Sequence, residues 1–218
     1  MVGMSGIAIT GVIATVLAIV ASRAESGSFD PYFGPVPPWT AVVGVSLLAF
    51  PVLRGLADRG WDLWGGDRSE WLLIAAAALV LAAVAIVADL VVRFPENMNV
   101  PAPASLAFYP TIAWVVEVVL HAVPLLALIV VFGSPDSTAD IRFWAMAAAV
   151  AAIEAGLQAS YATTLGTAVF SGVHLLVVGI VQVYLFRRVG FFPMLGFRLV
   201  YYAVWHLAWG AARLRLLW

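Results

Sequence analysis

Residues 165–186 read LGTAVFSGVHLLVVGIVQVYLF, a predominantly apolar run with a histidine, His174, near its middle. A membrane-spanning helix needs roughly 17–25 mostly apolar residues, so this stretch is long enough to cross a bilayer. Ionisable side chains are costly in lipid and mark functional positions more often than not. All three histidines of the chain, His121, His174 and His206, lie within apolar runs of this kind.

The composition of the whole chain is that of a membrane protein. Of 218 residues, 64% are hydrophobic and 11% are charged, whereas a soluble domain is about half apolar and about a quarter charged. We therefore predict an all-α polytopic transmembrane bundle of about seven spanning helices. It forms a single membrane domain over residues 1–218, with helices 1–3 in 1–100 and a core of helices 4–7 in 101–218. The expected helices cover about 5–22, 39–56, 71–93, 107–132, 141–161, 165–186 and 194–213.

Residue types that are missing exclude several functions. The chain has no cysteine, which excludes disulfides and thiolate chemistry. All 11 basic residues are arginine, and without a lysine amine a retinal Schiff base cannot form. A net charge of −1 gives no electrostatic basis for binding nucleic acid.

The arginines between the predicted helices indicate an orientation in the plasma membrane. One side holds Arg54, Arg59, Arg68, Arg142, Arg187 and Arg188, and the other holds Arg23, Arg93, Arg213 and Arg215. Because positive charge favours the inner side, the N-terminus is expected in the cytoplasm. The first helix lacks a positive n-region, so we expect a retained span and not a cleaved signal peptide.

Polar side chains inside the spans carry most of the functional information. In helix 3, Asp89 and Arg93 are four residues apart and are expected to pair. In helix 4, which contains YPTIAWVVEVVLHAVPLL, Glu117 and His121 share one face. Pro124 is expected to kink that helix just beyond them.

Helices 5 to 7 carry further polar residues near their centres. Glu154 and Gln158 share a face of helix 5, and helix 6 contributes His174. In helix 7, polar side chains recur every fourth position at Arg198, Tyr202 and His206. Five mid-span Glu and His side chains would cost about 15 kcal/mol if unpaired, at about 3 kcal/mol each. We therefore predict that they converge on one polar site in the C-terminal half.

Such a site is compatible with more than one chemistry. A carboxylate beside an imidazole can activate water for attack on an amide, and His or Tyr can stabilise the oxyanion. The same side chains could bind zinc, although no HExxH sequence occurs. Intramembrane Glu and His chains also relay protons in transporters. An inactive scaffold of the same fold is a further alternative.

Two stretches resemble the CAAX prenyl protease and bacteriocin-processing (CPBP, or Abi) family of intramembrane proteases. FSGVH has the form F-x-x-x-H, and GFFPMLGFRLVYYAVWHLAWG is similar to the last helix of that family, which carries H-x-x-x-N. The family also has an acidic motif, E-E-x-x-x-R. Here that motif is either VEVVLH, with His121 in place of the arginine, or IEAGLQ, with Gln158 there. Position 210, the family's asparagine, is glycine.

The resemblance covers about residues 107–213 and implies an intramembrane hydrolase acting on membrane-associated peptides. In one alignment Glu154, His174 and His206 match the three motifs. In the other, Glu117 and His206 match the first and last, and Glu154 takes the place of the middle histidine. The resemblance implies catalytic roles for Glu117, His121, Glu154, His174 and His206, and supporting roles for Gln158, Arg198 and Tyr202. A metal, if bound, would be zinc held by His174, His206, Glu117 and Glu154.

Overall fold

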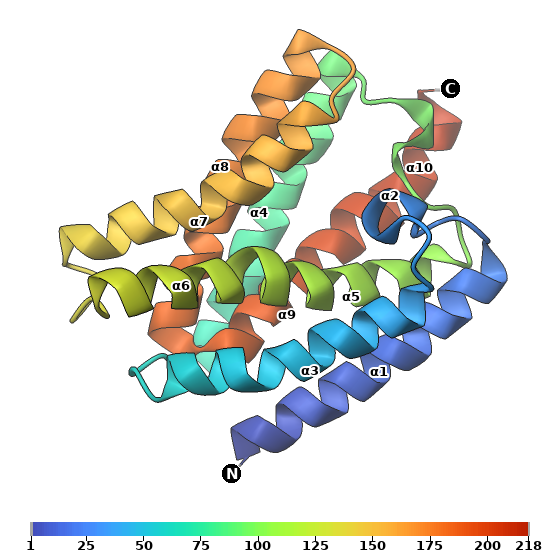
Figure 1. Ribbon diagram of the computed structural model, residues 1–218. Coiled ribbons are helices and arrows are strands. Elements are labelled where there is room, and N and C mark those ends of the chain that lie inside the picture. Colours follow the sequence, from blue (N-terminus) through green and yellow to red (C-terminus); the bar gives the residue numbers. More distant parts are fainter. Residues whose placement is uncertain (1, 218) are drawn as a thin grey trace.

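The computed structural model describes residues 2–217, and no strand occurs among them (Figure 1). The long helices are α1 (Val2–Ala24), α3 (Pro38–Ala57), α4 (Arg68–Val92), α7 (Ile141–Ser160) and α8 (Leu165–Val189). Two further helical stretches are interrupted by π-helical segments. They are α5 (Ser105–Val116), η2 (Glu117–Ala122) and α6 (Val123–Phe132), and α9 (Phe191–Tyr202), η3 (Ala203–Trp209) and α10 (Gly210–Leu216). Short α2 (Asp30–Phe33) and the 3₁₀ turn η1 (Glu96–Met98) lie in loops.

The protein is a polytopic α-helical membrane protein. Within residues 2–217, six helices are long and apolar enough to span a bilayer: Gly3–Ala24, Pro38–Ala57, Arg68–Val92, Ser105–Phe132, Ile141–Ser160 and Leu165–Val189. Large apolar side chains such as Val16, Leu73 and Val91 are exposed on their outer faces, as expected of surfaces that contact lipid. The seventh predicted span, about 194–213, is also helical but is not among the six. Its arginines, histidine and interfacial aromatics make it less apolar.

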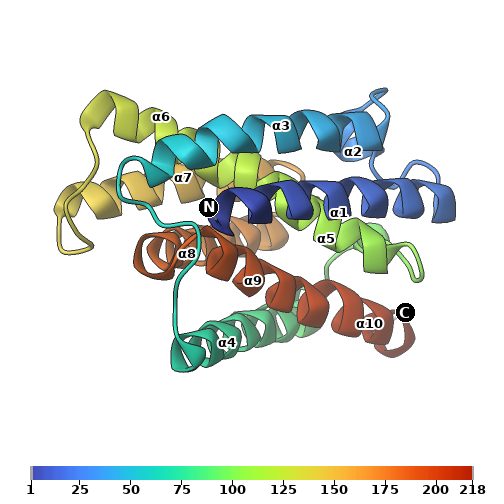
Figure 2. The same ribbon diagram turned by 90° about the horizontal axis from the view of Figure 1, so that it is seen from below.

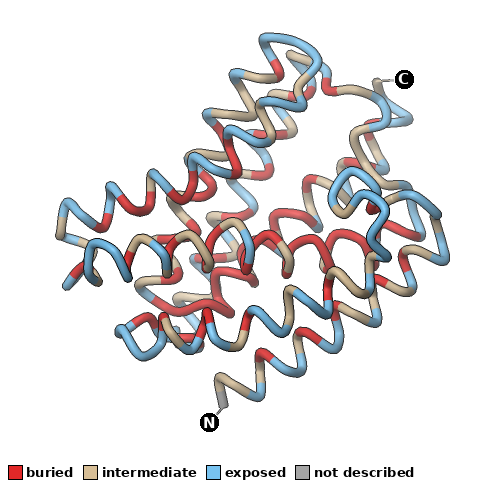
Figure 3. Tube along the Cα trace, viewed as in Figure 1, coloured by how far each residue is buried: buried red, intermediate tan, exposed pale blue. Residues whose placement is uncertain are grey.

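The helices pack as pairs around the C-terminal stretch. α1 lies against α3 and α5, whereas α7 and α8 form a hairpin joined by a short turn (Figure 1). The view from below shows α4 beside α9 and α10, on the side of the molecule opposite α3 (Figure 2). Buried residues concentrate on the inward faces and exposed residues on the outward ones (Figure 3).

Local sequence sets where the helices begin and turn. Asp67 caps α4 in a capping box, in which its side chain accepts the Glu70 amide and the Glu70 side chain accepts the Asp67 amide. Hydrogen bonds from Ser69 and the Glu70 amide lower the pKa of the Asp67 carboxyl. Between α8 and α9, Gly190 has φ +112 and sits against the backbone of residues 62–64, where a Cβ would have no room.

The two π-helical segments coincide with polar residues of the predicted site. η2 carries Glu117 and His121, and η3 carries His206. The sequence predicted a kink just beyond Glu117 and His121, and that position is wrong. The irregular segment is η2, which contains both residues and ends before Pro124. Proline lacks an amide hydrogen and its ring clashes with the preceding turn, so the distortion falls on its N-terminal side. Such wide turns alter side-chain register locally and often occur at functional sites.

Asp89 does not pair with Arg93, contrary to the prediction. α4 ends at Val92, and Arg93 leaves it with φ 54. Asp89 instead binds Arg213 of α10, with Nε to Oδ2 at 2.7 Å and Nη2 to Oδ1 at 3.0 Å. Arg213 also donates to the carbonyl oxygens of Phe94 and Pro95. This buried pair therefore fastens the segment after α4 to the last helix.

Candidate functional site

Six polar side chains from four helical stretches meet in the interior, and we name them the Arg198 cluster. Glu117 and His121 come from η2, Glu154 from α7, Gln182 from α8, and Arg198 and Tyr202 from α9. All six are buried. Glu117, His121 and Glu154 are three of the five Glu and His side chains predicted to share one site, and the other two, His174 and His206, have other partners.

Arg198 organises the cluster because all five of its N–H donors have partners. Nη1 donates to Glu154 Oε1 at 2.8 Å and Nη2 donates to Glu154 Oε2 at 2.7 Å, which makes a bidentate pair. Nη1 also donates to the Tyr202 hydroxyl at 3.0 Å, and Nη2 donates to the side-chain oxygen of Gln182, Oε1, at 2.8 Å. Nε donates to Glu117, which also accepts from Gln182. Arg198 therefore pairs with both carboxylates and also contacts Tyr202, four residues further along the same helical stretch.

His121 lies between the two carboxylates. Its Nδ1 is 3.4 Å from Glu117 Oε2, and its Nε2 is 3.7 Å from Glu154 Oε2. The Arg198 guanidinium pairs with both carboxylates, and Gln182 also donates to Glu117. The cluster is thus a hydrogen-bonded ionic network enclosed by protein, which is how buried charges are tolerated.

The structure gives no support for the zinc alternative. Among residues 2–217, no three His, Asp or Glu side chains are arranged to hold a metal ion. The guanidinium of Arg198 occupies the space between Glu117 and Glu154, where a cation would otherwise balance their charge. His174 and His206 bind other partners, described below.

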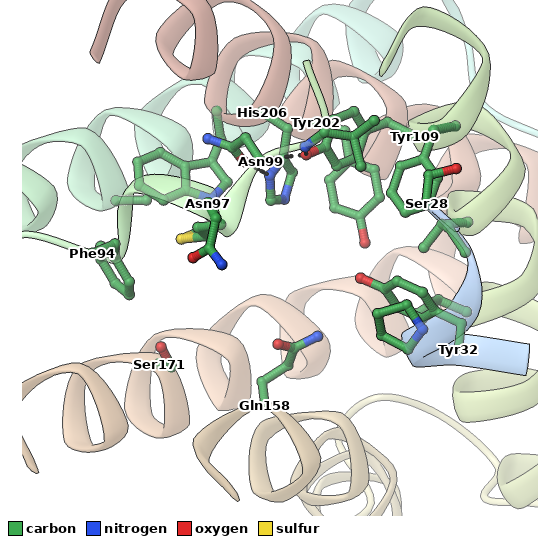
Figure 4. Close-up of a pocket in the computed structure, with 18 of the residues that line it drawn as sticks. Ser28, Tyr32, Phe94, Asn97, Asn99, Tyr109, Gln158, Ser171, Tyr202 and His206 are labelled. Carbon is green, nitrogen blue, oxygen red and sulfur yellow. Dashed lines mark hydrogen bonds between the residues drawn. The ribbon is translucent and has the colours of Figure 1, made fainter. Parts of the chain in front are cut away.

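A cavity of about 640 Å³ adjoins the Arg198 cluster. Glu154 lies on its wall, whereas Glu117 and His121 do not. Tyr202 and His206 face it from α9 and η3, and Gln158 and Ser171 face it from the opposite side (Figure 4). Exposed residues at Gly27, Glu96 and Pro101 are also part of the lining, so the cavity opens at the loops 25–33 and 93–104.

The loop between α1 and α3 folds back over this cavity. Tyr32 and Ser28 contribute to the lining (Figure 4). Phe29 is buried and packs against Phe108 of α5, with ring centroids 4.8 Å apart. The loop therefore forms part of the cavity wall and does more than connect the two helices.

His206 is held on three sides at the cavity wall. Its ring stacks on Tyr109 with centroids 4.4 Å apart and meets the edge of Tyr202 at 4.9 Å. Nδ1 lies 2.7 Å from Asn99 Oδ1. No hydrogen-bond partner for Nε2 occurs among residues 2–217.

His174 joins the same cavity from α8. Its Nε2 lies 3.0 Å from the Tyr201 hydroxyl, and its ring stacks on Phe170. Gln158, predicted to share a face with Glu154, also lines the cavity. The cavity thus brings Glu154, His174 and His206 to one space, while Glu117 and His121 stay behind the wall.

Sequence reasoning missed Asn99, Gln182 and Tyr109. No motif in the sequence includes Gln182. Its amide inside an apolar span is nevertheless a signal that could have identified it. Asn99 lies in a loop rich in proline and asparagine, where polar residues are ordinary. Tyr109 sits near a helix end, where an aromatic residue is typical of the membrane interface.

The fold and site together define a polytopic helical membrane protein with an ionic cluster beside an internal cavity. Comparison with models of protein families, with curated proteins and with solved structures finds no match.

Proposed function

We propose that the protein is an intramembrane hydrolase that cleaves membrane-associated peptides in the cavity beside the Arg198 cluster. The observation that carries this proposal is a cavity, reached at the loops 25–33 and 93–104, that has Glu154, His174 and His206 on its wall. A hydrolase needs a base and a carbonyl-polarising donor facing one water-reachable space. A proton relay would instead need its groups strung across the bilayer.

Within this proposal the base is His206, and the carboxylates are structural. Both oxygens of Glu154 already accept from Arg198, and an ion-paired carboxylate is a poor proton acceptor. His206 Nε2 borders the cavity and is free to accept a proton from water. The water oxygen attacks the amide carbon, the C–N bond breaks, and His206 passes the proton to the departing amine.

Tyr202 supplies the donor to the developing oxyanion. Its hydroxyl accepts a hydrogen bond from Arg198 Nη1, which leaves its own proton to donate into the cavity. That contact with a cation makes the hydroxyl a better donor. Arg198 thereby couples the buried carboxylates to the reacting carbonyl.

The lining indicates the class of substrate. The cavity volume lies within the range of small-ligand sites, roughly 300–1,000 Å³. Aromatic side chains such as Phe94, Phe108 and Trp205 alternate with a few polar groups, which suits a short peptide with apolar side chains. The substrate reaches the cavity from the face that carries the loops 25–33 and 93–104.

The orientation prediction places that face outside the cell. Arg213 must be removed from the outer arginines, because it is buried and paired with Asp89. This leaves Arg23, Arg93 and Arg215 on that side, against the six arginines on the opposite side. The positive-inside rule then favours, more strongly than before, a plasma-membrane protein with its N-terminus in the cytoplasm.

Cleavage in ¹⁸O-labelled water tests the hydrolase directly. Purified protein in lipid nanodiscs would be given a library of quenched fluorescent peptides, each carrying one acyl chain. Wild-type protein should release fragments with one ¹⁸O in the new carboxyl group, and His206→Gln should slow release about 100-fold or more. Gly44→Ala is the matched control, because a Cβ at this α3 position meets open space.

A binding scaffold without catalysis is the second candidate. The observation in its favour is that Glu117 and Glu154 are both paired with Arg198. If E-E-x-x-x-R is aligned with His121 in the arginine's place, Val116 occupies the first glutamate's position, and it lines the cavity. Absence of ¹⁸O incorporation from every peptide, with protein that stays folded, would support the scaffold and overturn the hydrolase.

A further inference from the structure

We propose that Asn99 is the positioning residue for His206, and that Gly210 is glycine because the Asn99 carboxamide occupies its side-chain space. The proposal rests on the hydrolase function in one respect only, the role of His206 as a base. The arrangement itself is a statement about the state of the His206 ring and can be tested without any substrate.

The carboxamide of Asn99 lies where a side chain at position 210 would begin. A Cβ on Gly210 would be 2.9 Å from Asn99 Nδ2 and 3.2 Å from its Cγ. A separation of 2.9 Å is essentially never seen for a real Cβ atom, so alanine at 210 would displace the amide. Gly210 follows His206 by four residues, and the glycine leaves the space beside the imidazole open to a side chain from elsewhere in the chain.

The same helix that holds His206 also holds the segment carrying Asn99. Arg213 donates to the carbonyl oxygens of Phe94 and Pro95 at 2.6 and 2.9 Å. Asp89 accepts the Phe94 amide at 2.8 Å. One helical stretch therefore holds the segment 94–99 in three ways. His206 contacts Asn99, Gly210 leaves space for the Asn99 carboxamide, and Arg213 binds the carbonyl oxygens of Phe94 and Pro95.

Tyr109 fixes which end of the amide faces the imidazole. Its hydroxyl accepts the Val100 amide at 3.0 Å, so its own proton points to Asn99 Oδ1 at 3.2 Å. The oxygen of Asn99 is thus shared between Tyr109 and His206 Nδ1. An amide oxygen can only accept, so the proton of a neutral His206 ring is on Nδ1.

This assignment leaves the lone pair of Nε2 directed to the cavity. The other tautomer would place a hydrogen on Nε2 and remove the base. This orientation of Asn99 costs free energy, because its Nδ2 is buried without a hydrogen-bond partner among residues 2–217. An apolar side chain that only filled the space would avoid that cost. We infer that Asn99 is present to select the tautomer.

Nitrogen NMR of ¹⁵N-histidine protein in nanodiscs tests the proposal. The chain has three histidines, and His206→Gln assigns the His206 signals. Wild-type protein should show a protonated Nδ1 and an unprotonated Nε2. Asn99→Ala and Gly210→Ala should both shift the ring towards protonation at Nε2, and Gly44→Ala should leave it unchanged.

Two results would overturn the proposal. One is a wild-type His206 protonated at Nε2 and not at Nδ1. The other is a tautomer that does not change in Asn99→Ala. The hydrolase proposal is judged separately, because the expected tautomer shift with no peptide cleaved by wild-type protein would refute the function and leave the role of Asn99 intact.

Discussion

Arg198 shows why the cluster needs arginine and not another cation. Its planar fork reaches Glu154 with two parallel hydrogen bonds and still has donors for Glu117, Gln182 and Tyr202. A lysine ammonium has three donors on a single atom and could not satisfy five acceptors. The buried carboxylates therefore depend on this one side chain for compensation.

Replacing Arg198 by methionine should strongly destabilise the protein. The change leaves Glu117 and Glu154 buried beside one another without the guanidinium, and breaking a buried ionic group in this way costs about 3–5 kcal/mol. Thermal unfolding in nanodiscs should show a markedly lower midpoint than that of wild type.

The matched control removes the charges together. Adding Glu117→Gln and Glu154→Gln to Arg198→Met takes away the uncompensated carboxylates and should recover most of the lost stability. An Arg198→Met midpoint equal to that of wild type would show that the cluster contributes nothing to the fold.

Sequence spacing predicted part of the site at the residue scale. The pairs Glu117 with His121 and Arg198 with Tyr202 are four residues apart on helices, and helical geometry alone brings such pairs together. Asn99 was not predictable, because its role depends on the path of a loop and on the space left by Gly210. Asp89 was assigned the wrong partner, since a neighbour in sequence was preferred to Arg213 in a distant helix.

At the scale of elements, apolar length determined the spans and local capping determined their ends. The six candidate spans overlap the predicted ranges, because roughly 20 apolar residues have few alternatives in a bilayer. The π-helical segments were not predicted, since one extra residue in a turn leaves the apolar pattern nearly unchanged. The end of α4 at Val92 likewise depends on where the following loop is fastened.

The α4 capping box should make stability depend on pH. The pKa of Asp67 is lowered in the folded protein, chiefly by its hydrogen bond from Ser69. Its contribution is therefore present above the unfolded value of about 3.9 and is lost as pH falls through the lower folded value. The melting midpoint of wild type should fall more steeply than that of Asp67→Asn between about pH 5 and pH 3.

Asparagine also caps helices but carries no charge. The two proteins should therefore melt alike near neutral pH and separate only in acid, by a small amount, because Asp67 is exposed. Parallel melting curves over the whole range would show that the cap does not titrate with folding.

At the scale of the whole molecule, the polar residues are sorted by depth. Large apolar side chains are exposed on the outside, the Arg198 cluster is buried, and the cavity runs from Glu154 to the loops 25–33 and 93–104. The composition predicted this arrangement of apolar residues outside and charged residues inside, because charges within spans must avoid lipid. The existence and opening of the cavity required the structure, since they depend on how α7, α8 and the loops 25–33 and 93–104 pack.

Cysteine accessibility tests the central claim, a water-reachable cavity open on one face only, most directly. The chain has no cysteine, so Ala102→Cys, Asp136→Cys and Ser171→Cys report the two faces and the cavity wall in an otherwise unreactive protein. Val173→Cys, on the same helix as Ser171 but exposed on the outer surface, is the lipid-facing control.

In intact cells, a small membrane-impermeant thiol reagent should label Ala102→Cys and Ser171→Cys. It should reach Asp136→Cys only after lysis and Val173→Cys in neither case. A Ser171→Cys that stays unreactive from both faces, or reacts only from the face of Asp136, would contradict the account.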